Sequence, residues 1–367
     1  MKRIIKAIVF ILMAVMLVFM ISCGDKSTGD PSGSKNHSGT QNIDVYTAGY
    51  EFNAAGNWDY KVWKNDALLF TFVSGSAASI FVSGNDVYCT GSEYDQYDKR
   101  IIRVWKNNSV LYTLDYQSGW NCYATDIFVS GNDVYVTTYE TKNNITYTNY
   151  AAKVWKNGTV LYNLSSDGKG LRAQGIYVSN NDIYVCGSSL NQYNKNIATV
   201  WKNGNILFTF GGVIVSGSAA SCAYDIKVLG NTVYVSGNPG NSSIASVYKY
   251  EGTINKGSYS YELPVGTMNP YITPYHLDVE ARAPNDVYWF FYHSSITRIF
   301  KGNSEIYALI NEKINDLAVK NGNLYLAGFE SESGIEKAKV WKNGEELYTL
   351  TDGTYDARAE QIFLVAR

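Results

Sequence analysis

A near-identical phrase of eleven residues recurs five times in this chain. It reads VWKNDALLFTF, VWKNNSVLYTL, VWKNGTVLYNL, VWKNGNILFTF and VWKNGEELYTL, at residues 62–72, 104–114, 154–164, 200–210 and 340–350. Repetition at this spacing indicates that one supersecondary unit is copied along the chain. The repeat therefore indicates a structural unit and not a catalytic motif.

Each unit is predicted to contain four short strands. In the third unit they are residues 175–179, 182–187, 198–202 and 206–210, which are rich in β-branched and aromatic residues. Glycine and asparagine in SGND (83–86) and KNG (156–158) supply the positive φ that tight hairpins need. A third-strand aromatic residue, which we expect in the core, marks seven units roughly 40 to 50 residues apart. These residues are Trp63, Trp105, Trp155, Trp201, Tyr248, Phe300 and Trp341.

The two ends of the repeat region complement each other. The region begins at residues 43–50 with a strand of the second type and ends at residues 360–367 with a strand of the first type. Pairing these strands completes a seventh sheet and removes exposed sheet edges. The sequence therefore predicts an all-β fold, a seven-bladed β-propeller of four-stranded blades over residues 43–367, closed by its N-terminal and C-terminal strands.

The strand order in residues 126–164, DIFVSGNDVYVTTYE followed by AAKVWKNGTVLYNL, resembles the units of NHL-type propellers. The resemblance implies that the first strand of each unit lines the central channel. It covers residues 43–367 as architecture, with VYKY (247–250) and IFKG (299–302) departing from the VWKN motif. It implies nothing about function, because propellers support many unrelated activities.

The N-terminal segment resembles a bacterial lipoprotein signal. Lys2, Arg3 and Lys6 precede an apolar run at residues 7–21, followed by MISC at residues 20–23. The resemblance implies that residues 1–22 are removed and that Cys23 is lipidated, which would anchor the protein to a membrane. Residues 23–42 are poor in apolar residues and are expected to be a flexible tether. The expected location is the bacterial cell envelope, at the outer membrane in a Gram-negative organism.

Composition narrows the possible functions. The chain has 33 acidic and 31 basic residues, a balance that argues against nucleic acid as a partner. Three histidines and no CxxC spacing give no indication of a metal centre or cofactor, and no nucleophile or phosphate-binding motif occurs. Cys89 and Cys186 are expected to be buried thiols in strands, whereas Cys122 and Cys222 are expected in loops.

The connections are expected to fall on two faces of the propeller. The tight turns carry a lysine in every unit, which could form a cationic rim, but hairpin aspartates such as Asp86 and Asp133 should neutralise much of it. The long, variable connections lie on the other face, where binding usually occurs. Candidate ligand-binding residues at the channel mouth on that face are Trp120, Tyr123, Asp126, Arg172, Gln174, Tyr224, Asp225, Tyr275, His276, Asp316, Arg358 and Glu360.

Three functions are compatible with this pattern. The first is a monomeric, non-catalytic binding module that recognises a protein or glycan through the long-connection face. The second is a carbohydrate-active hydrolase or lyase using two carboxylates such as Asp126 and Asp225. The third is a scaffold for envelope assembly. A structural alternative applies to the acidic residues themselves, since they could instead bond to amides of neighbouring blades.

Overall fold

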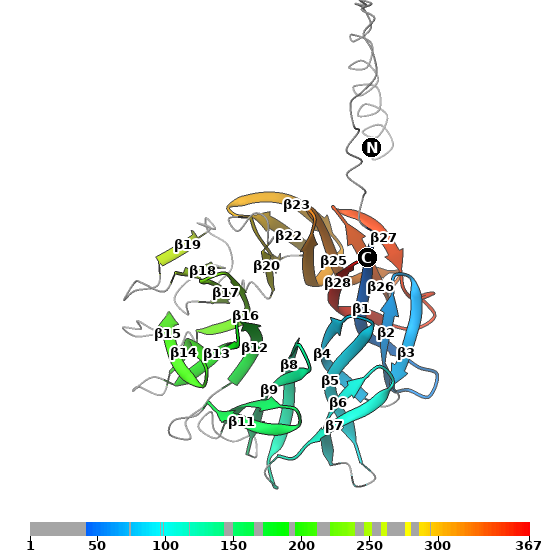
Figure 1. Cartoon of the computed structure of the whole chain (residues 1–367). Helices are drawn as coiled ribbons and strands as arrows, with labels where there is room; N and C mark the ends of the chain where they lie inside the picture. Colours follow the sequence, from blue (N-terminus) through cyan, green and yellow to red (C-terminus); the bar gives the residue numbers. More distant parts are fainter. Residues whose placement is uncertain are drawn as a thin grey trace, which may run out of the picture. The chain divides into compact units, whose positions relative to one another are not determined.

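The computed structural model describes residues 42–72, 75–95, 97, 99–116, 118–142, 150–164, 172–190, 195–210, 221–238, 246–251, 258–262, 276–279, 286–293 and 295–367. These residues form seven antiparallel sheets of four strands each. Figure 1 shows the sheets arranged around a central axis. The predicted all-β, seven-bladed propeller is therefore confirmed.

In blades B, C and D the four strands are consecutive in the chain, whereas blade A begins with the C-terminal strand β28. Blade A contains β28 (Ala357–Ala366), β1 (Ile43–Phe52), β2 (Trp58–Lys64) and β3 (Ala67–Phe72). Blade B contains β4 (Gly75–Ser83), β5 (Asp86–Tyr94), β6 (Arg100–Lys106) and β7 (Ser109–Leu114). Blade C contains β8 (Asn121–Ser130), β9 (Asp133–Thr141), β10 (Tyr150–Lys156) and β11 (Thr159–Asn163). Blade D contains β12 (Arg172–Ser179), β13 (Asp182–Leu190), β14 (Asn196–Lys202) and β15 (Asn205–Phe210).

The remaining three blades have the same order. Blade E contains β16 (Cys222–Leu229), β17 (Thr232–Asn238), β18 (Ser246–Tyr250) and β19 (Ser258–Glu262). Blade F contains β20 (Leu277–Val279), β21 (Val287–His293), β22 (Ile296–Lys301) and β23 (Ser304–Ile310). Blade G contains β24 (Glu312–Lys320), β25 (Asn323–Glu332), β26 (Ile335–Lys342) and β27 (Glu345–Thr349). The first strand of each blade contacts the first strand of the next, so these strands line the axis (Figure 1).

Blade A is closed by the two chain ends, as the sequence predicts. β1 pairs with β28 from Ile43 opposite Ala366 to Glu51 opposite Ala357. The amide N–H of Arg367 also donates to the carbonyl oxygen of Asn42, at the place where the other blades have their first hairpin turn. The ring therefore has no unpaired inner strand at its seam.

The repeated VWKN motif has a specific use for every residue. Its tryptophan is at most 3% exposed in all five copies, and its valine at most 1%. The lysine pairs with the hairpin aspartate and lies over the second-strand tyrosine, as with Lys106, Asp86 (2.7 Å) and Tyr88 (5.4 Å). The asparagine, such as Asn107 at φ 55°, has a left-handed backbone and its side chain accepts the N–H of Val87. The motif therefore connects the hairpin between the first and second strands of a blade with the hairpin between its third and fourth strands.

Ion pairing on the tight-turn face follows the same pattern in five of the seven blades. Lys64, Lys106, Lys156, Lys202 and Lys301 pair with Asp44, Asp86, Asp133, Asp182 and Asp286 at distances from 2.6 to 3.0 Å. This confirms that the hairpin aspartates neutralise the lysines. Because such pairs are partly exposed, they contribute little to stability individually, and this face offers little free positive charge.

The glycine of KNG is required by the neighbouring blade. Gly158 and Gly204 have φ near 81°, and a Cβ at either position would lie 2.9 Å from the ring of Tyr112 or Tyr162, respectively. Each of these tyrosines belongs to the fourth strand of the preceding blade. The fourth-strand aromatic residues are therefore half-buried and pack between adjacent blades, whereas the third-strand aromatic residues are buried in the core.

The prediction about two cysteines is wrong. Cys122 and Cys222 lie in β8 and β16, not in loops, because both inner strands begin earlier than their apolar pattern indicates. All four cysteines in the described residues are free, and Cys89 and Cys186 are buried in strands as expected. Burial raises the pKa of Cys122 to about 12 and of Cys222 to about 11, which leaves both thiols protonated and unreactive.

Candidate ligand-binding face

The predicted site residues fall into two layers at the long-connection end of the inner strands. Tyr123, Arg172 and Arg358 occupy matching positions near the starts of β8, β12 and β28, and Trp120 is a half-buried bend residue just before β8. Deeper in the channel, six of the seven described inner strands have a β-bulge, and β20 (Leu277–Val279) has none. The bulge and the following position hold Asp126, Gln174, Tyr224, Asp225, Asp316 and Glu360, with His276 at the corresponding place before β20. Tyr275 lies outside the described residues.

The residues after the bulges connect neighbouring blades. Asp126 accepts the N–H of Ile127 at 2.8 Å and, from blade D, the N–H of Ile176 at 2.8 Å. It also accepts the Ser79 hydroxyl of blade B at 2.7 Å. Three carboxylates and one amide make this connection to the next blade. The pairs are Asp126 with Ile176, Asp225 with Leu277 (3.1 Å), Asp316 with Ile362 (3.0 Å) and Gln361 with Ile80 (2.8 Å).

We call Ser79, Asp126, Asp225, His276, Asp316 and Gln361 the latch residues, because together they bridge six of the seven blade junctions. The structural alternative is thus confirmed for Asp126, Asp225 and Asp316, whose carboxylates accept backbone N–H groups of adjacent blades. In blade D the equivalent position is Gly175, where a Cβ would lie 3.5 Å from the Cα of Asp225. Ligand binding by the latch residues stays a prediction.

Charge is concentrated in the channel at blades E, F and G. His276 Nδ1 lies 3.7 Å from Asp225 Oδ2 and 3.4 Å from Asp316 Oδ1. Burial opposes the imidazolium, but the Asp316 and Asp225 carboxylates outweigh it and raise the pKa of His276 to about 9. Burial also opposes the charge of Lys227, yet Asp225, Asp278 and Asp316 raise its pKa above the usual value. These cations hold the acidic cluster together.

The opposite half of the channel is aromatic. Phe81, Phe128, Tyr177 and Phe363 come from four successive inner strands, at the same register as Lys227 and Asp278. The Phe81 ring lies 4.7 Å from both Phe128 and Phe363, and the Phe128 ring lies 4.9 Å from Tyr177. This layer packs ring against ring, so it serves the channel as a core and not as an open ligand platform.

The His276 ion pairs predict a pH-dependent stability. The folded pKa lies above the ordinary value of 6.5, so this contribution is complete below about pH 6.5 and is lost as pH rises through 9. We expect the free energy of unfolding to fall by about 3 kcal/mol across this interval. Urea unfolding at pH 6 and pH 9.5 measures it. The variant His276→Gln should show less than half of the decrease, and an equal decrease in the variant would contradict this assignment.

A cationic and aromatic cluster crosses blades B, C and D at the channel mouth. The Tyr123 and Tyr139 rings stack at 4.9 Å with an interplanar angle of 14°. The guanidinium of Arg100 lies over Tyr123 at 4.5 Å, and that of Arg172 lies over Tyr139 at 5.5 Å and over Tyr150 at 4.6 Å. We call these five residues the arginine–tyrosine stack. Cation–π contacts hold the guanidinium groups in place without neutralising their charge.

A second cluster at the mouth is already neutralised. Arg358 makes an ion pair with Glu336, donates to the Tyr50 hydroxyl at 3.1 Å and lies 4.7 Å from the Phe329 ring. Burial raises the pKa of the neighbouring Glu360, with opposing contributions from Tyr50 and Arg358. Arg358 therefore interacts mainly with residues of blades A and G. Its charge is less available to a ligand than the charges of Arg100 and Arg172 in the arginine–tyrosine stack.

Exposed large side chains are segregated by type. In the described residues, the exposed aliphatic side chains lie on the outermost strands, for example Leu68 and Ile206. The exposed aromatic side chains all lie at the long-connection end of the blades. They are Trp58 (41% exposed), Tyr94 (54%), Tyr97 (80%), Tyr292 (37%) and Tyr355 (37%). This separation gives the long-connection face exposed aromatic side chains that the outermost strands lack.

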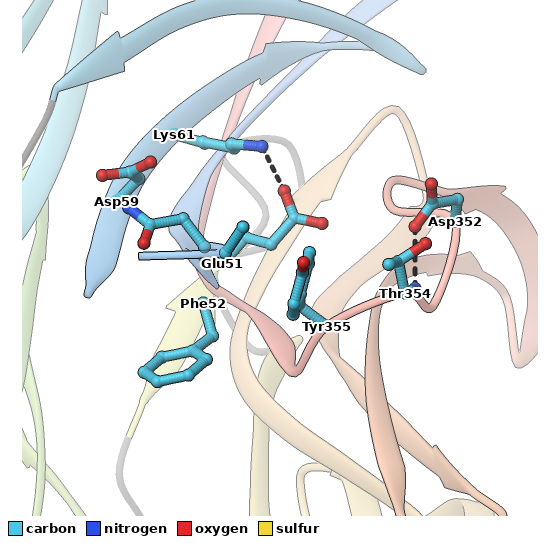
Figure 2. A pocket seen from close by; sticks show the side chains of 9 residues that line it. Glu51, Phe52, Asp59, Lys61, Asp352, Thr354 and Tyr355 are labelled. Atoms are coloured by element: carbon cyan, nitrogen blue, oxygen red, sulfur yellow. Dashed lines mark hydrogen bonds and ion pairs between the residues drawn. The ribbon is translucent and has the colours of Figure 1, made fainter. Parts of the chain in front are cut away.

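Two cavities open away from the channel mouth. One, of about 290 Å³, lies in blade A beside the β27–β28 connection, where Lys61 pairs with Glu51 and Tyr355 forms part of the wall (Figure 2). The other, of about 390 Å³, lies on the tight-turn face between blades D and E and includes the Lys202–Asp182 pair. The lysines that line the two cavities are ion-paired, whereas Asp59 and Asp352 line the first cavity without an ion pair to a described residue.

The sequence did not identify Arg100, Tyr139 or Tyr150 as site residues. Tyr139 and Tyr150 lie near the ends of two paired strands, because β9 continues to Thr141 and β10 begins at Tyr150. The sequence feature that could have identified these tyrosines is the alternation of side chains along the second and third strands. Extending β9 and β10 in this alternation brings Tyr139 and Tyr150 close to Tyr123. Among the described residues, no three histidine, cysteine, aspartate or glutamate side chains are grouped to bind a metal ion, and no helix is long and apolar enough to span a membrane.

Comparisons with known proteins show the fold. No family profile matches the chain, and a search of curated proteins finds no related sequence. The β-propeller domain of the Trilobed protease from Pyrococcus furiosus is similar at a TM-score of 0.53 and 12% identity, covering 86% of this chain and 94% of that chain. A putative 6-phosphogluconolactonase from Bacteroides uniformis is similar at 0.52 and 11% identity, covering 89% and 100%. At these identities the likeness concerns architecture alone, and the described part of this chain is a seven-bladed β-propeller.

Proposed function

We propose that this protein is an exported, lipid-anchored propeller that holds a protein or glycan partner at its long-connection face without chemical turnover. The observation that carries the proposal is the concentration of exposed aromatic residues and of the arginine–tyrosine stack on this one face. Aromatic and arginine side chains are enriched where proteins bind partners. The closed ring supplies a rigid support for them.

The N-terminal sequence supports the anchoring part of the proposal. The basic residues, the apolar run and Cys23 provide the order of a lipoprotein signal, and the polar residues 24–42 provide reach between lipid and propeller. In a bacterial host, labelled palmitate should enter the wild-type protein and not the variant Cys23→Ala. Equal labelling of both proteins would contradict lipidation at this residue.

The contacts in the channel support a binder over the alternative hydrolase or lyase. Both oxygens of Asp126 and both oxygens of Asp225 accept backbone N–H groups. A general acid or base must be free to exchange a proton with a substrate. Burial does raise the pKa of Asp126 to about 6, but this carboxyl group is committed to three protein donors. Release of a shortened product on incubation with envelope glycans would favour the hydrolase or lyase.

Site-directed crosslinking tests the binding face. We expect a photo-crosslinking residue in place of Tyr97, which is 80% exposed on the long-connection face, to capture a partner in cells. The matched control is the same substitution at Ile206, which is 56% exposed on an outermost strand. Capture only from position 206 would place the partner elsewhere. Capture of envelope assembly proteins at position 97 would favour the scaffold function.

A further inference from the structure

Two arginines differ from the others in the described residues. Six arginines are described, and four of them are paired with carboxylates: Arg103 with Glu93, Arg298 with Glu305, Arg358 with Glu336 and Arg367 with Asp44. Arg100 and Arg172 make no ion pair with a described carboxylate, and both belong to the arginine–tyrosine stack. The two guanidinium groups that lack a described carboxylate partner thus share one site.

Both guanidinium groups are held in fixed orientations. Arg100 donates to the Ser92 hydroxyl at 3.2 Å and to the Tyr94 hydroxyl at 2.5 Å, and Arg172 donates to the Tyr150 hydroxyl at 2.9 Å. A guanidinium has five N–H donors, so each group retains donors for an external acceptor. Their rings and hydroxyl partners restrict rotation, which lowers the entropy lost when a carboxylate binds.

The geometry points to a ligand that carries more than one negative charge. The consecutive spacings of 4.5, 4.9 and 5.5 Å place the two guanidinium carbons no more than about 15 Å apart. Two carboxylates on one polymer chain can contact both guanidinium groups across this distance. Because planar guanidinium groups bind carboxylates through two parallel hydrogen bonds, they are well suited to such a ligand.

The surface of the stack favours a hydroxylated ligand. The faces of Tyr123 and Tyr139 are occupied by each other and by guanidinium groups, so this platform contributes mainly N–H groups and ring edges. Tyr97, which is 80% exposed in the β5–β6 connection, adds an aromatic ring on which a sugar could stack.

We infer that the arginine–tyrosine stack binds the carboxylates of an acidic polysaccharide. This inference rests on the proposed function and specifies its ligand class as a glycan of uronate type. Arg100 and Arg172 contact neighbouring carboxylates of one polysaccharide chain, and Tyr94 and Tyr97 line its path. No bond is made or broken in this binding.

The test uses the full-length protein in mild detergent with two matched polymers. Polygalacturonate carries free carboxylates, and its methyl ester has the same sugars without the charge. We expect calorimetry to give at least tenfold tighter binding to polygalacturonate, with affinity falling as salt increases. Equal affinity for both polymers, or no binding to either, would overturn the inference. Tighter binding to poly-glutamate than to polygalacturonate would overturn it in favour of an acidic protein.

Variants assign the binding to the stack. Arg100→Gln and Arg172→Gln should each weaken polygalacturonate binding about tenfold, consistent with loss of a charge-assisted bidentate contact. Arg172→Lys keeps a charge on a long side chain and should weaken binding as well, because lysine lacks the planar fork. The control Arg298→Gln removes an arginine paired with Glu305 on the outer strands and should bind as the wild type does. Unchanged affinity in folded Arg100→Gln and Arg172→Lys would contradict the assignment.

The two proposals can fail separately. Partner capture through position 97 without polygalacturonate binding would leave the binding module in place and remove its uronate ligand. Absence of capture at position 97 together with stack-dependent polygalacturonate binding would retain the ligand and remove the wider interaction face. The melting temperature of each variant shows whether the fold is retained.

Discussion

A chain that ends at residue 356 should lose its cooperative unfolding transition. The truncation removes β28, which pairs with β1 along its full length and buries Ala357, Ala359 and Ile362. It also removes Gln361, the latch to Ile80, and Ile362, the partner of Asp316. The unpaired edge of β1 and an open apolar face remain, which favours aggregation. Differential scanning calorimetry should show no single transition, and circular dichroism should show loss of native β-structure.

The matched control for this truncation is a circular permutant. A short glycine linker can join Arg367 to Asn42, because the N–H of Arg367 already donates to the carbonyl oxygen of Asn42 at 2.9 Å. New ends are placed in the tight turn between Gly84 and Asn85, which connects β4 to β5. The permutant keeps the twenty-eight strands of the described residues and should retain one cooperative transition. Cooperative melting of the truncated chain within about 5 °C of the full chain would contradict the role of the closure.

Replacement of Gly187 or Gly328 by alanine should destabilise the protein severely. A Cβ at Gly187 would lie 1.9 Å from the carbonyl oxygen of Arg172, and a Cβ at Gly328 would lie 2.0 Å from that of Lys313. Both glycines face the inner strand beside its bulge, where backbone and not a flexible side chain fills the space. We expect each change to cost about 3 kcal/mol or more in the free energy of unfolding, measured with urea.

Gly84→Ala is the control for these glycine variants. Gly84 has a positive φ of 59°, but nothing lies within 4 Å of its would-be Cβ. The control therefore isolates the backbone preference for glycine, which costs about 1 kcal/mol. An equal loss of stability in Gly84→Ala and Gly187→Ala would show that the close approach of the inner strand is not the cause. Gly187→Ala should also displace Arg172 and so weaken any ligand held by the arginine–tyrosine stack.

The sequence identified much of the architecture because the repeat records local structure. Trp105, Lys106 and Asn107 adjoin one another in the chain, and their roles recur wherever VWKN recurs. The hairpin aspartates and their lysines could be paired by the same register. The two ends of the repeat region could be paired because the N-terminal end lacks a first strand and the C-terminal end supplies one.

Only part of the candidate site could be predicted from the sequence. Arg358 and Tyr123 were placed near the mouth, since strand starts follow from the repeat. The bulges were not foreseen, although they turn Asp126 and Asp225 toward the next blade and satisfy both carboxylates there. A bulge adds one residue to a single strand, and its position depends on pairing geometry that the residue types do not specify.

The amino-acid sequence by itself determined the sheet count, the strand order, the closure and the identity of the core aromatic residues, because these depend on patterns that repeat along one chain segment. The tertiary structure alone decided which non-repeating side chains meet. Arg100, Tyr139 and Arg172 come from three blades, and His276 pairs with aspartates of the blades on either side. Such contacts arise between variable positions that are far apart in sequence, and only the assembled ring brings them within reach of one another.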